Sequence, residues 1–312
     1  MRAFLLTRLG FLIVSVFGAF TIAFLVMRLI PGDPAQVILG DYATKESIAR
    51  LRETLGLDRP VWVQYVSFVG RALRGDFGAS LVTQRPAFFE VFSVFLPTIQ
   101  LAAAGALVSM LIGVPAGVLA ATRRNRPLDY VTMTLALGSM SMPVFWLGLL
   151  LLFVCSFTLG WTPTVGAGGD EGWLSMLHHL VLPALALGLS LGAMVTRMTR
   201  SAMLEVLRQD YMRTARAKGL RELLIIGKHG LRNAALPIVT ILGINFGIQL
   251  GGTILIETVF ARPGMGSLLI SSIYQRDYPL VQALVMVFAT SVVFVNLLVD
   301  LVYAVFDPRV RR

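Results

Sequence analysis

Residues 97–120 read PTIQLAAAGALVSMLIGVPAGVLA, and the six residues that follow, 121–126, read ATRRNR. A helix needs about 20 apolar residues to cross the hydrocarbon core of a bilayer, and this uncharged run is long enough. Basic residues that lie directly beside an apolar span set the orientation of a membrane protein. The same pattern recurs along the chain, and it decides the fold.

The composition of the whole chain agrees with this interpretation. Of its 312 residues, 56% are hydrophobic and only 14% are charged, whereas a soluble domain carries roughly a quarter charged residues. These proportions exclude a soluble enzyme, a free-standing binding domain and a disordered chain. The net charge is +10, but the basic residues cluster beside apolar spans, which does not indicate nucleic-acid binding. The single cysteine, Cys155, lies in an apolar run, so no disulfide framework is expected.

The apolar segments predict an all-α polytopic membrane protein with six transmembrane helices. The expected spans are residues 9–29, 97–120, 131–158, 180–196, 236–256 and 281–304. Pro143 lies inside the third span and predicts a kink there. The first apolar run is longer than a signal-peptide core and no A-x-A cleavage site follows it, so we expect a retained helix.

The distribution of charge predicts the topology. With six spans, most of the 27 Lys and Arg residues fall in the two terminal segments and in the loops around 123–126 and 197–232. On the other side, the basic residues between positions 28 and 85 are balanced by acidic ones. The positive-inside rule therefore places both termini in the cytoplasm.

Two polar segments are longer than simple connectors and divide the chain. We expect a stub and first span at 1–30, an extracytoplasmic segment at 31–96, and a membrane core at 97–312 with a cytoplasmic loop at 197–235.

The outer segment contains signals for two short helices. Thr44 is a candidate N-cap and Gly56 a candidate terminator for the first helix, and Pro60 precedes the second. Spacing of three places Trp62, Tyr65 and Phe68 on one stripe of the second helix. The helices are interpreted either as lying on the bilayer or on the bundle, or as a docking platform for an external partner.

The inner loop contains a basic amphipathic helix. Asp210 is the expected N-cap and Gly219 the expected terminator. A second helix is expected from about Leu220 to Asn233, and Pro237 is expected in the first turn of the fifth span. The small side chains of Ala215 and Ala217 would allow another surface to approach closely. The residues alone leave two interpretations: a helix that touches anionic lipid, or a lever pushed by a cytoplasmic partner.

Polar side chains at membrane depth are costly and usually face an interior. The candidates for a translocation pathway are Asn245, Gln249 and Glu257 on the fifth span and Asn296 on the sixth. The alternative for Glu257 is a salt bridge to Arg262.

Glycines repeated every four residues allow helices to approach closely in a membrane. Such repeats are present at Gly113 and Gly117, at Gly188 and Gly192, and at Gly243, Gly247 and Gly251. Each is interpreted as helix packing. For the repeat from Gly243 to Gly251 we prefer a subunit interface or the wall of a pathway.

The chain carries no signature of catalysis or metal binding. Gly227-Lys228-His229 is no P-loop, and neither H-E-x-x-H nor G-x-S-x-G is present. We therefore expect no enzyme activity, no metal site and no cofactor in this chain. An ion-coupled secondary transporter is the rival class, but it needs paired charges in mid-membrane, which are scarce here.

Residues 210–220, DYMRTARAKGL, and 229–237, HGLRNAALP, resemble the cytoplasmic loop of bacterial ABC importer permeases. The resemblance is to the dipeptide/oligopeptide branch, with its glutathione and nickel relatives. Further matches are PGDP at 31–34, GDFG at 75–78, RDYP at 276–279 and NLLVD at 296–300. The chain departs from the family in lacking the glutamate of the Glu-Ala-Ala motif.

This resemblance implies an ABC type I importer permease fold in the bacterial inner membrane. The implied partners are a second, paralogous permease subunit, two subunits that bind ATP and Mg²⁺, and an extracytoplasmic solute-binding protein. The expected solutes are short peptides, glutathione among them, with nickel or another small solute as the alternative. The residues expected to couple to the ATPases are Asp210, Tyr211, Arg213, Thr214, Ala215, Arg216, Ala217, Lys218 and Gly219.

Overall fold

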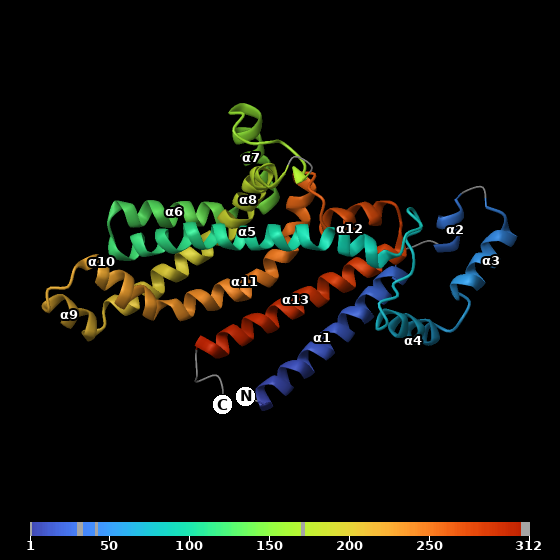
Figure 1. The fold of residues 1–312 in the computed structure, drawn as a ribbon, viewed down its shortest axis with the longest axis horizontal. Coiled ribbons are helices and arrows are strands. Elements are labelled where there is room, and N and C mark those ends of the chain that lie inside the picture. Colours follow the sequence, from blue (N-terminus) through green and yellow to red (C-terminus); the bar gives the residue numbers. More distant parts are fainter. Residues whose placement is uncertain (1, 30–33, 41–42, 170–171, 307–312) are drawn as a thin grey trace. The chain divides into compact units, whose positions relative to one another are not determined.

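The computed structural model describes residues 2–29, 34–40, 43–169 and 172–306, and within these ranges the chain is helical (Figure 1). In the same ranges, the β pairing is limited to an isolated antiparallel bridge between Ala79 and Pro86. The predicted all-α class is confirmed. The chain divides into two compact units, one of residues 97–263 with 295 onward, the other of residues 2–96 with 264–294.

The first unit holds most of the membrane core. Its elements are α5 (Ala87–Thr122) from Pro97 onward, α6 (Pro127–Ser141), α7 (Val144–Leu151), the π-helical segment η1 (Leu152–Thr158), α8 (Trp173–Leu207), α9 (Asp210–Ala217), α10 (Glu222–Leu224), the π-helical segment η3 (Ile225–Leu231), α11 (Arg232–Val259) and the end of α13 (Tyr278–Phe306).

The second unit holds the elements of the outer segment together with helices that precede and follow it in the sequence. They are α1 (Arg2–Leu29), α2 (Pro34–Leu39), α3 (Lys45–Leu55), α4 (Val61–Ala72), the start of α5, α12 (Met265–Tyr274) and most of α13. The two predicted short helices are confirmed. The Thr44 hydroxyl accepts a hydrogen bond from the Ser47 amide at 3.2 Å, and Gly56 ends α3 at a φ of 67°.

Within the described residues, four helical stretches are long and apolar enough to cross a membrane: α5, α8, the continuous helix Glu222–Val259, and α13 over Tyr278–Val299. A bent pair, α6 with α7 and η1, could form one more span. In α1, the described apolar part is the shorter stretch Gly10–Leu25. Predicted spans two, four, five and six therefore coincide with long apolar helices.

The kink predicted at Pro143 is confirmed, and it is a full break. The two halves of the pair are bent by 107°. Proline disfavours the helical conformation in the residue before it, and Met142 is extended with φ −89° and ψ 133°. A new helix then starts directly after Pro143.

The predicted start of the fifth span at Pro237 is wrong. Pro237 lies inside α11, which continues from η3 without a break. Its neighbours Ala234 and Ile238 are buried in a cluster with Val195 and Met203 of α8. Packing on both sides of the proline holds the helix through a position where proline removes a backbone hydrogen bond.

Glycines bring α5 and α8 into close contact. A Cβ atom on Gly113 would lie 2.8 Å from the Gly192 carbonyl oxygen, and one on Gly117 would lie 2.6 Å from that of Thr196. From the other side, a Cβ on Gly188 would lie 3.0 Å from the Gly105 carbonyl oxygen. Since lipid supplies no hydrophobic force between helices, this backbone proximity is a main source of their association.

We expect Gly113→Val and Gly117→Val to destabilise the membrane-inserted protein by about 1–3 kcal/mol each, because the obstructing atoms are backbone carbonyl oxygens and stiff β-branched side chains. Gly138→Val on α6 is the matched control, because a Cβ there meets nothing within 4 Å. The measurement is the midpoint of thermal unfolding in detergent. Equal midpoints for Gly113→Val and Gly138→Val would show that the contact is not tight.

Candidate functional site

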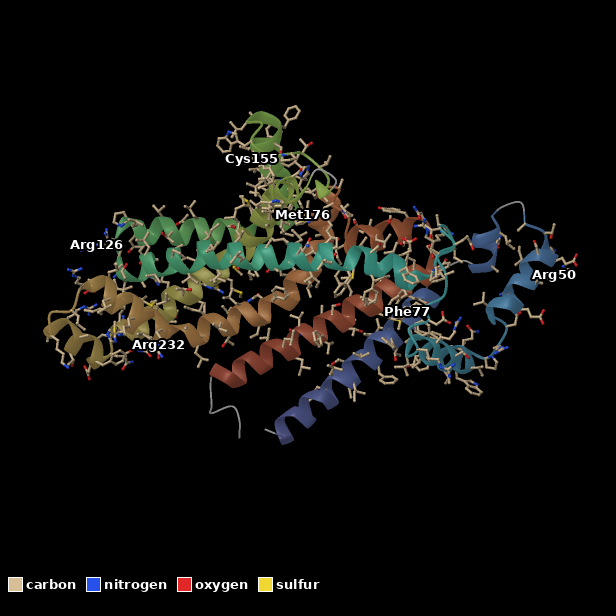
Figure 2. All side chains as sticks on the ribbon, in the orientation of Figure 1. Arg50, Phe77, Arg126, Cys155, Met176 and Arg232 are labelled. Carbon is tan, nitrogen blue, oxygen red and sulfur yellow. The ribbon has the colours of Figure 1, made fainter. Side chains whose placement is uncertain are left out.

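The basic loop between α8 and α11 forms one end of the first unit (Figure 1). Figure 2 shows Arg126 and Arg232 at this end, whereas Cys155 and Met176 lie at the other. Gly219 has a φ of 73°, and α9 ends just before it, as predicted. A Cβ there would meet nothing within 4 Å, so the glycine is needed for its left-handed conformation rather than for space.

The capping role predicted for Asp210 is wrong. The residue before the helix is Gln209, which is extended, and no side chain caps the helix. Asp210 is instead the first helical residue. Its negative charge in the first turn favours the helix through the dipole, without a capping hydrogen bond.

An apolar cluster anchors α9 to the rest of the loop. Met212 and Ala215 are buried against Ile225 of η3, with Val206 and Leu207 of α8 packed around them. Gly230 lies beside the same cluster, because a Cβ there would be 3.7 Å from Cε of Met212. The helix is thus attached to the end of α8 and to the start of the helix that continues into α11.

This packing corrects the expectation that Ala215 faces a partner. Ala215 is only 8% exposed and lies on the inner face of α9, because it fills the space next to Ile225. The outward face consists of exposed residues: Tyr211, Arg213, Thr214, Arg216, Ala217 and Lys218.

Two polar contacts hold this outward face in place. The Asn233 amide donates to the Tyr211 hydroxyl at 3.1 Å. Arg216 donates to the Glu222 carboxylate at 2.9 Å, and this hydrogen bond raises the pKa of the guanidinium. The face is basic and exposed, which suits contact with a second surface.

The polar residues at membrane depth do not form one cluster. Glu257 is fully buried, accepts a 2.6 Å hydrogen bond from the Thr98 hydroxyl, and interacts electrostatically with buried Arg262. This placement agrees with the alternative predicted for Glu257, and it leaves no surface of Glu257 facing a pathway in this conformation. Asn245 is buried and donates to the Ile241 carbonyl of its own helix at 2.7 Å.

Gln249 and Asn296 occupy two different places. Gln249 is 6% exposed and lies where α11 crosses α5, next to Gly105. Among the residues that the structure describes, neither its amide oxygen nor its nitrogen has a hydrogen-bond partner. Asn296 of α13 is exposed and lies against Gly247 of α11.

The glycine repeat of α11 packs mainly within the chain. Gly243 faces Val299, and Gly247 faces Asn296, so both bring α11 close to the end of α13. A Cβ on Gly251 would meet nothing within 4 Å. Only Gly251 is therefore open to the subunit interface or pathway wall preferred for this repeat.

The aromatic stripe of α4 is divided between two environments. Tyr65 and Phe68 pack against Phe24 of α1, with ring centroids 5.2 Å and 5.6 Å away. Both side chains are half-buried by this packing. Trp62 is 71% exposed, and Val66 on the next turn is also exposed.

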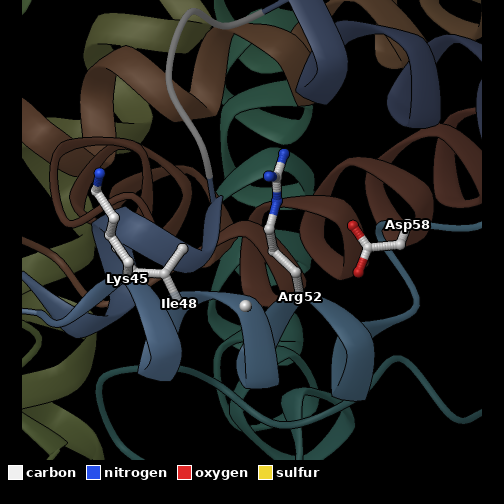
Figure 3. Close-up of a pocket in the computed structure, with 5 residues that line it drawn as sticks. Lys45, Ile48, Arg52 and Asp58 are labelled. Atoms are coloured by element: carbon white, nitrogen blue, oxygen red, sulfur yellow. The ribbon is translucent and has the colours of Figure 1, made fainter.

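A hollow of about 290 Å³ lies beside α3 (Figure 3). It is lined by Lys45, Ile48, Ala49, Arg52 and Asp58. Figure 3 shows the Lys45 and Arg52 side chains extending to the same side of α3, with Asp58 beside Arg52. Both signs of charge are present in this exposed hollow, and nothing in it resembles a catalytic arrangement.

The sequence analysis missed one ion pair near the basic loop. Arg200 of α8 binds Asp129 of α6 through two short contacts of 2.6 and 2.7 Å. Asp129 is 2% exposed. The signal in the sequence is an acidic residue in the first turn of a helix that follows three arginines.

Comparison with known proteins agrees with this architecture. Residues 113–312 match the family described as the binding-protein-dependent transport system inner membrane component, and residues 1–95 match the N-terminal part of the same membrane component. The glutathione transport system permease protein GsiC of Escherichia coli (strain K12) is 43% identical over 311 residues, which cover 100% of this chain and 99% of GsiC. GsiC of Salmonella typhi is 45% identical over the same length.

A solved chain of the inward-facing MetNI methionine ABC transporter is similar in fold, with a TM-score of 0.58 at 19% identity. The likeness covers 70% of this chain and 97% of that one. The chain belongs to the family of binding-protein-dependent transport system inner membrane components, the permease subunits of ABC importers, and it is a multi-pass protein of the inner membrane.

Proposed function

We propose that this chain forms half of the translocation pathway of an ATP-driven importer for short peptides, glutathione among them. The identity of 43–45% to glutathione permeases over their whole length carries the proposal. Its partners are a second, paralogous permease subunit, two ATP-binding subunits and an extracytoplasmic solute-binding protein. ATP and Mg²⁺ are bound by the ATP-binding subunits, and this chain supplies the membrane path and the coupling surface.

The proposed topology has six spans and cytoplasmic termini. In this proposal the broken pair α6–η1 and the shorter apolar helix α1 each cross the membrane in addition to the four long apolar stretches, which would give six crossings. An even number of crossings returns the chain to its starting side. The gathering of basic residues around α9 supports the cytoplasm as that side.

The outward face of α9 is the proposed coupling surface. The burial of Met212 and Ala215 supports this proposal, because it attaches α9 to both α8 and η3. A displacement of α9 by the closing ATP-binding subunits would therefore move two spans together. Rigid elements that move between two arrangements are a common device for such transmission.

The pathway is proposed to include Asn296 and the open face at Gly251. An exposed amide at membrane depth is costly against lipid, so protein or water is expected to cover Asn296. Gln249 is proposed to reach the pathway only in another conformation, since it is buried here.

The outer segment is proposed to receive the solute-binding protein. On α4 the exposed residues Trp62, Val66 and Leu73 form an apolar stripe, because their spacings follow the turns of a helix. The bilayer surface is the alternative occupant of this stripe.

The solute is tested by reconstituting the importer with its partner subunits in vesicles. We expect uptake of labelled glutathione or a dipeptide only with the binding protein outside and ATP on the cytoplasmic side. Nickel is tested in parallel. Uptake of nickel in place of peptides would contradict the solute proposal, and uptake driven by a proton gradient without ATP would contradict the transport class.

The coupling surface is tested at Thr214, which is exposed and donates to the Asp210 carbonyl. Thr214→Trp should reduce both uptake and solute-stimulated ATP hydrolysis at least about tenfold, because interface residues at tightly packed positions contribute this much or more. Thr214→Ser keeps the hydroxyl and should behave like the wild type. A lipid-binding helix would tolerate the added aromatic ring. Normal uptake by Thr214→Trp would therefore argue for lipid contact.

Topology and docking are tested together with single cysteines, since Cys155 is the chain's one cysteine. In a Cys155→Ala background, Trp62→Cys should react with a membrane-impermeant thiol reagent from outside, and Arg213→Cys only from inside. The loaded binding protein should protect Trp62→Cys. The reverse labelling would refute the topology, and labelling without protection would refute the docking face.

A further inference from the structure

We propose that the Asp129–Arg200 ion pair is a positioning pair that makes α6 move with the coupling helix. The proposal rests on the proposed coupling role of α9. It goes further by assigning one contact that extends the motion from the loop to the broken third span.

Arg200 and Asp129 form a bidentate ion pair with one defined geometry. Nε and Nη2 of Arg200 donate to the two carboxylate oxygens of Asp129 at 2.6 and 2.7 Å. The backbone N–H of Asn125 donates a third hydrogen bond, to Oδ2 of Asp129, at 3.0 Å. A planar guanidinium that binds both oxygens of a carboxylate fixes direction as well as distance.

The backbone before Asp129 is shaped for this contact. Asn125 has a φ of 58°, a left-handed conformation that asparagine adopts more easily than most residues. This turn directs the Asn125 amide to the carboxylate, and Asp129 stays 2% exposed although the loop around it is exposed. The α5–α6 turn and α8 are thus joined through one side chain.

On the cytoplasmic side, α8 connects the pair to α9. One turn beyond Arg200, Met203 is fully buried and lies 3.1 Å from the position of a Cβ on Gly230. Val206 and Leu207 follow, and they contact the cluster of Met212 and Ala215. A force on α9 therefore reaches Arg200 through packed side chains only.

On the other side, α6 leads to the break at Pro143. The Ser139 hydroxyl donates to the Leu189 carbonyl of α8 at 3.0 Å, so α6 follows α8 along its length. Beyond the break, Gly148 of α7 packs on α11, because a Cβ there would lie 3.1 Å from Ile256. The Asp129–Arg200 ion pair is thus the charged contact that holds α6 to α8, the helix to which the coupling helix α9 is attached.

A merely stabilising pair would have the same geometry, so the test separates stability from coupling. Replacing a buried ion pair by apolar residues of similar size often preserves stability, whereas removal of one partner leaves a buried charge. The informative variant is therefore the double substitution Asp129→Leu with Arg200→Met. Thr134→Ala, at an exposed position of the same helix α6, is the control.

The experiment measures labelled glutathione taken up per ATP hydrolysed by the importer reconstituted with its partner subunits. We expect the double variant to assemble in normal amounts and to hydrolyse ATP, but with the uptake ratio reduced about tenfold, the upper range for residues that transmit coupling. Arg200→Lys, which keeps the charge without the planar fork, should give an intermediate ratio. Thr134→Ala should keep the wild-type ratio.

A wild-type ratio in the double variant would overturn the proposal and leave the pair with a stabilising role alone. The Thr214→Trp variant distinguishes this failure from that of the coupling role itself. If Thr214→Trp abolishes uptake while the double variant is normal, α9 couples to the membrane helices without the Asp129–Arg200 ion pair. If Thr214→Trp is also normal, the coupling role of α9 fails first.

Discussion

The close contact between α5 and α8 is the constraint on which the first unit depends. In lipid, helices associate through close packing and a few polar contacts. Gly113, Gly117 and Gly188 allow the two backbones to approach until a single methyl group would not fit. α11 packs against the same pair of helices, and this arrangement places Gln249 beside Gly105.

Polar contacts lie at the two ends of this packed core. Asp129 and Arg200 join helices at the basic end, and Thr98 binds Glu257 at the other. Between them the contacts are mostly apolar, which favours motion of whole helices over local deformation. Among the described residues, the buried Gln249 amide and the buried Thr199 hydroxyl have no hydrogen-bond partner. An unpartnered amide is costly in this conformation, and it would gain free energy from a rearrangement that gives it one.

The comparison with glutathione permeases and the geometry of the loop support the same mechanism from independent directions. Family membership follows from identity over the full length of the chain. The loop geometry shows how a force could pass from α9 into the membrane, because Met212 and Ala215 face inward and leave a basic face outside. In the proposed mechanism, the ATP chemistry belongs to the partner subunits, and this chain supplies the coupling surface and the membrane path.

The sequence by itself determined the features that depend on a few neighbouring residues. The apolar runs, the break at Pro143, the cap at Thr44 and the left-handed turn at Gly219 were predictable, because backbone sterics and burial in lipid act locally. Tertiary structure alone decided which side of each helix meets which neighbour. Ala215 turned inward to Ile225, Tyr65 and Phe68 turned to α1, and Glu257 paired with Thr98. Periodicity identifies a stripe on a helix, but the partner that covers it comes from a distant part of the chain.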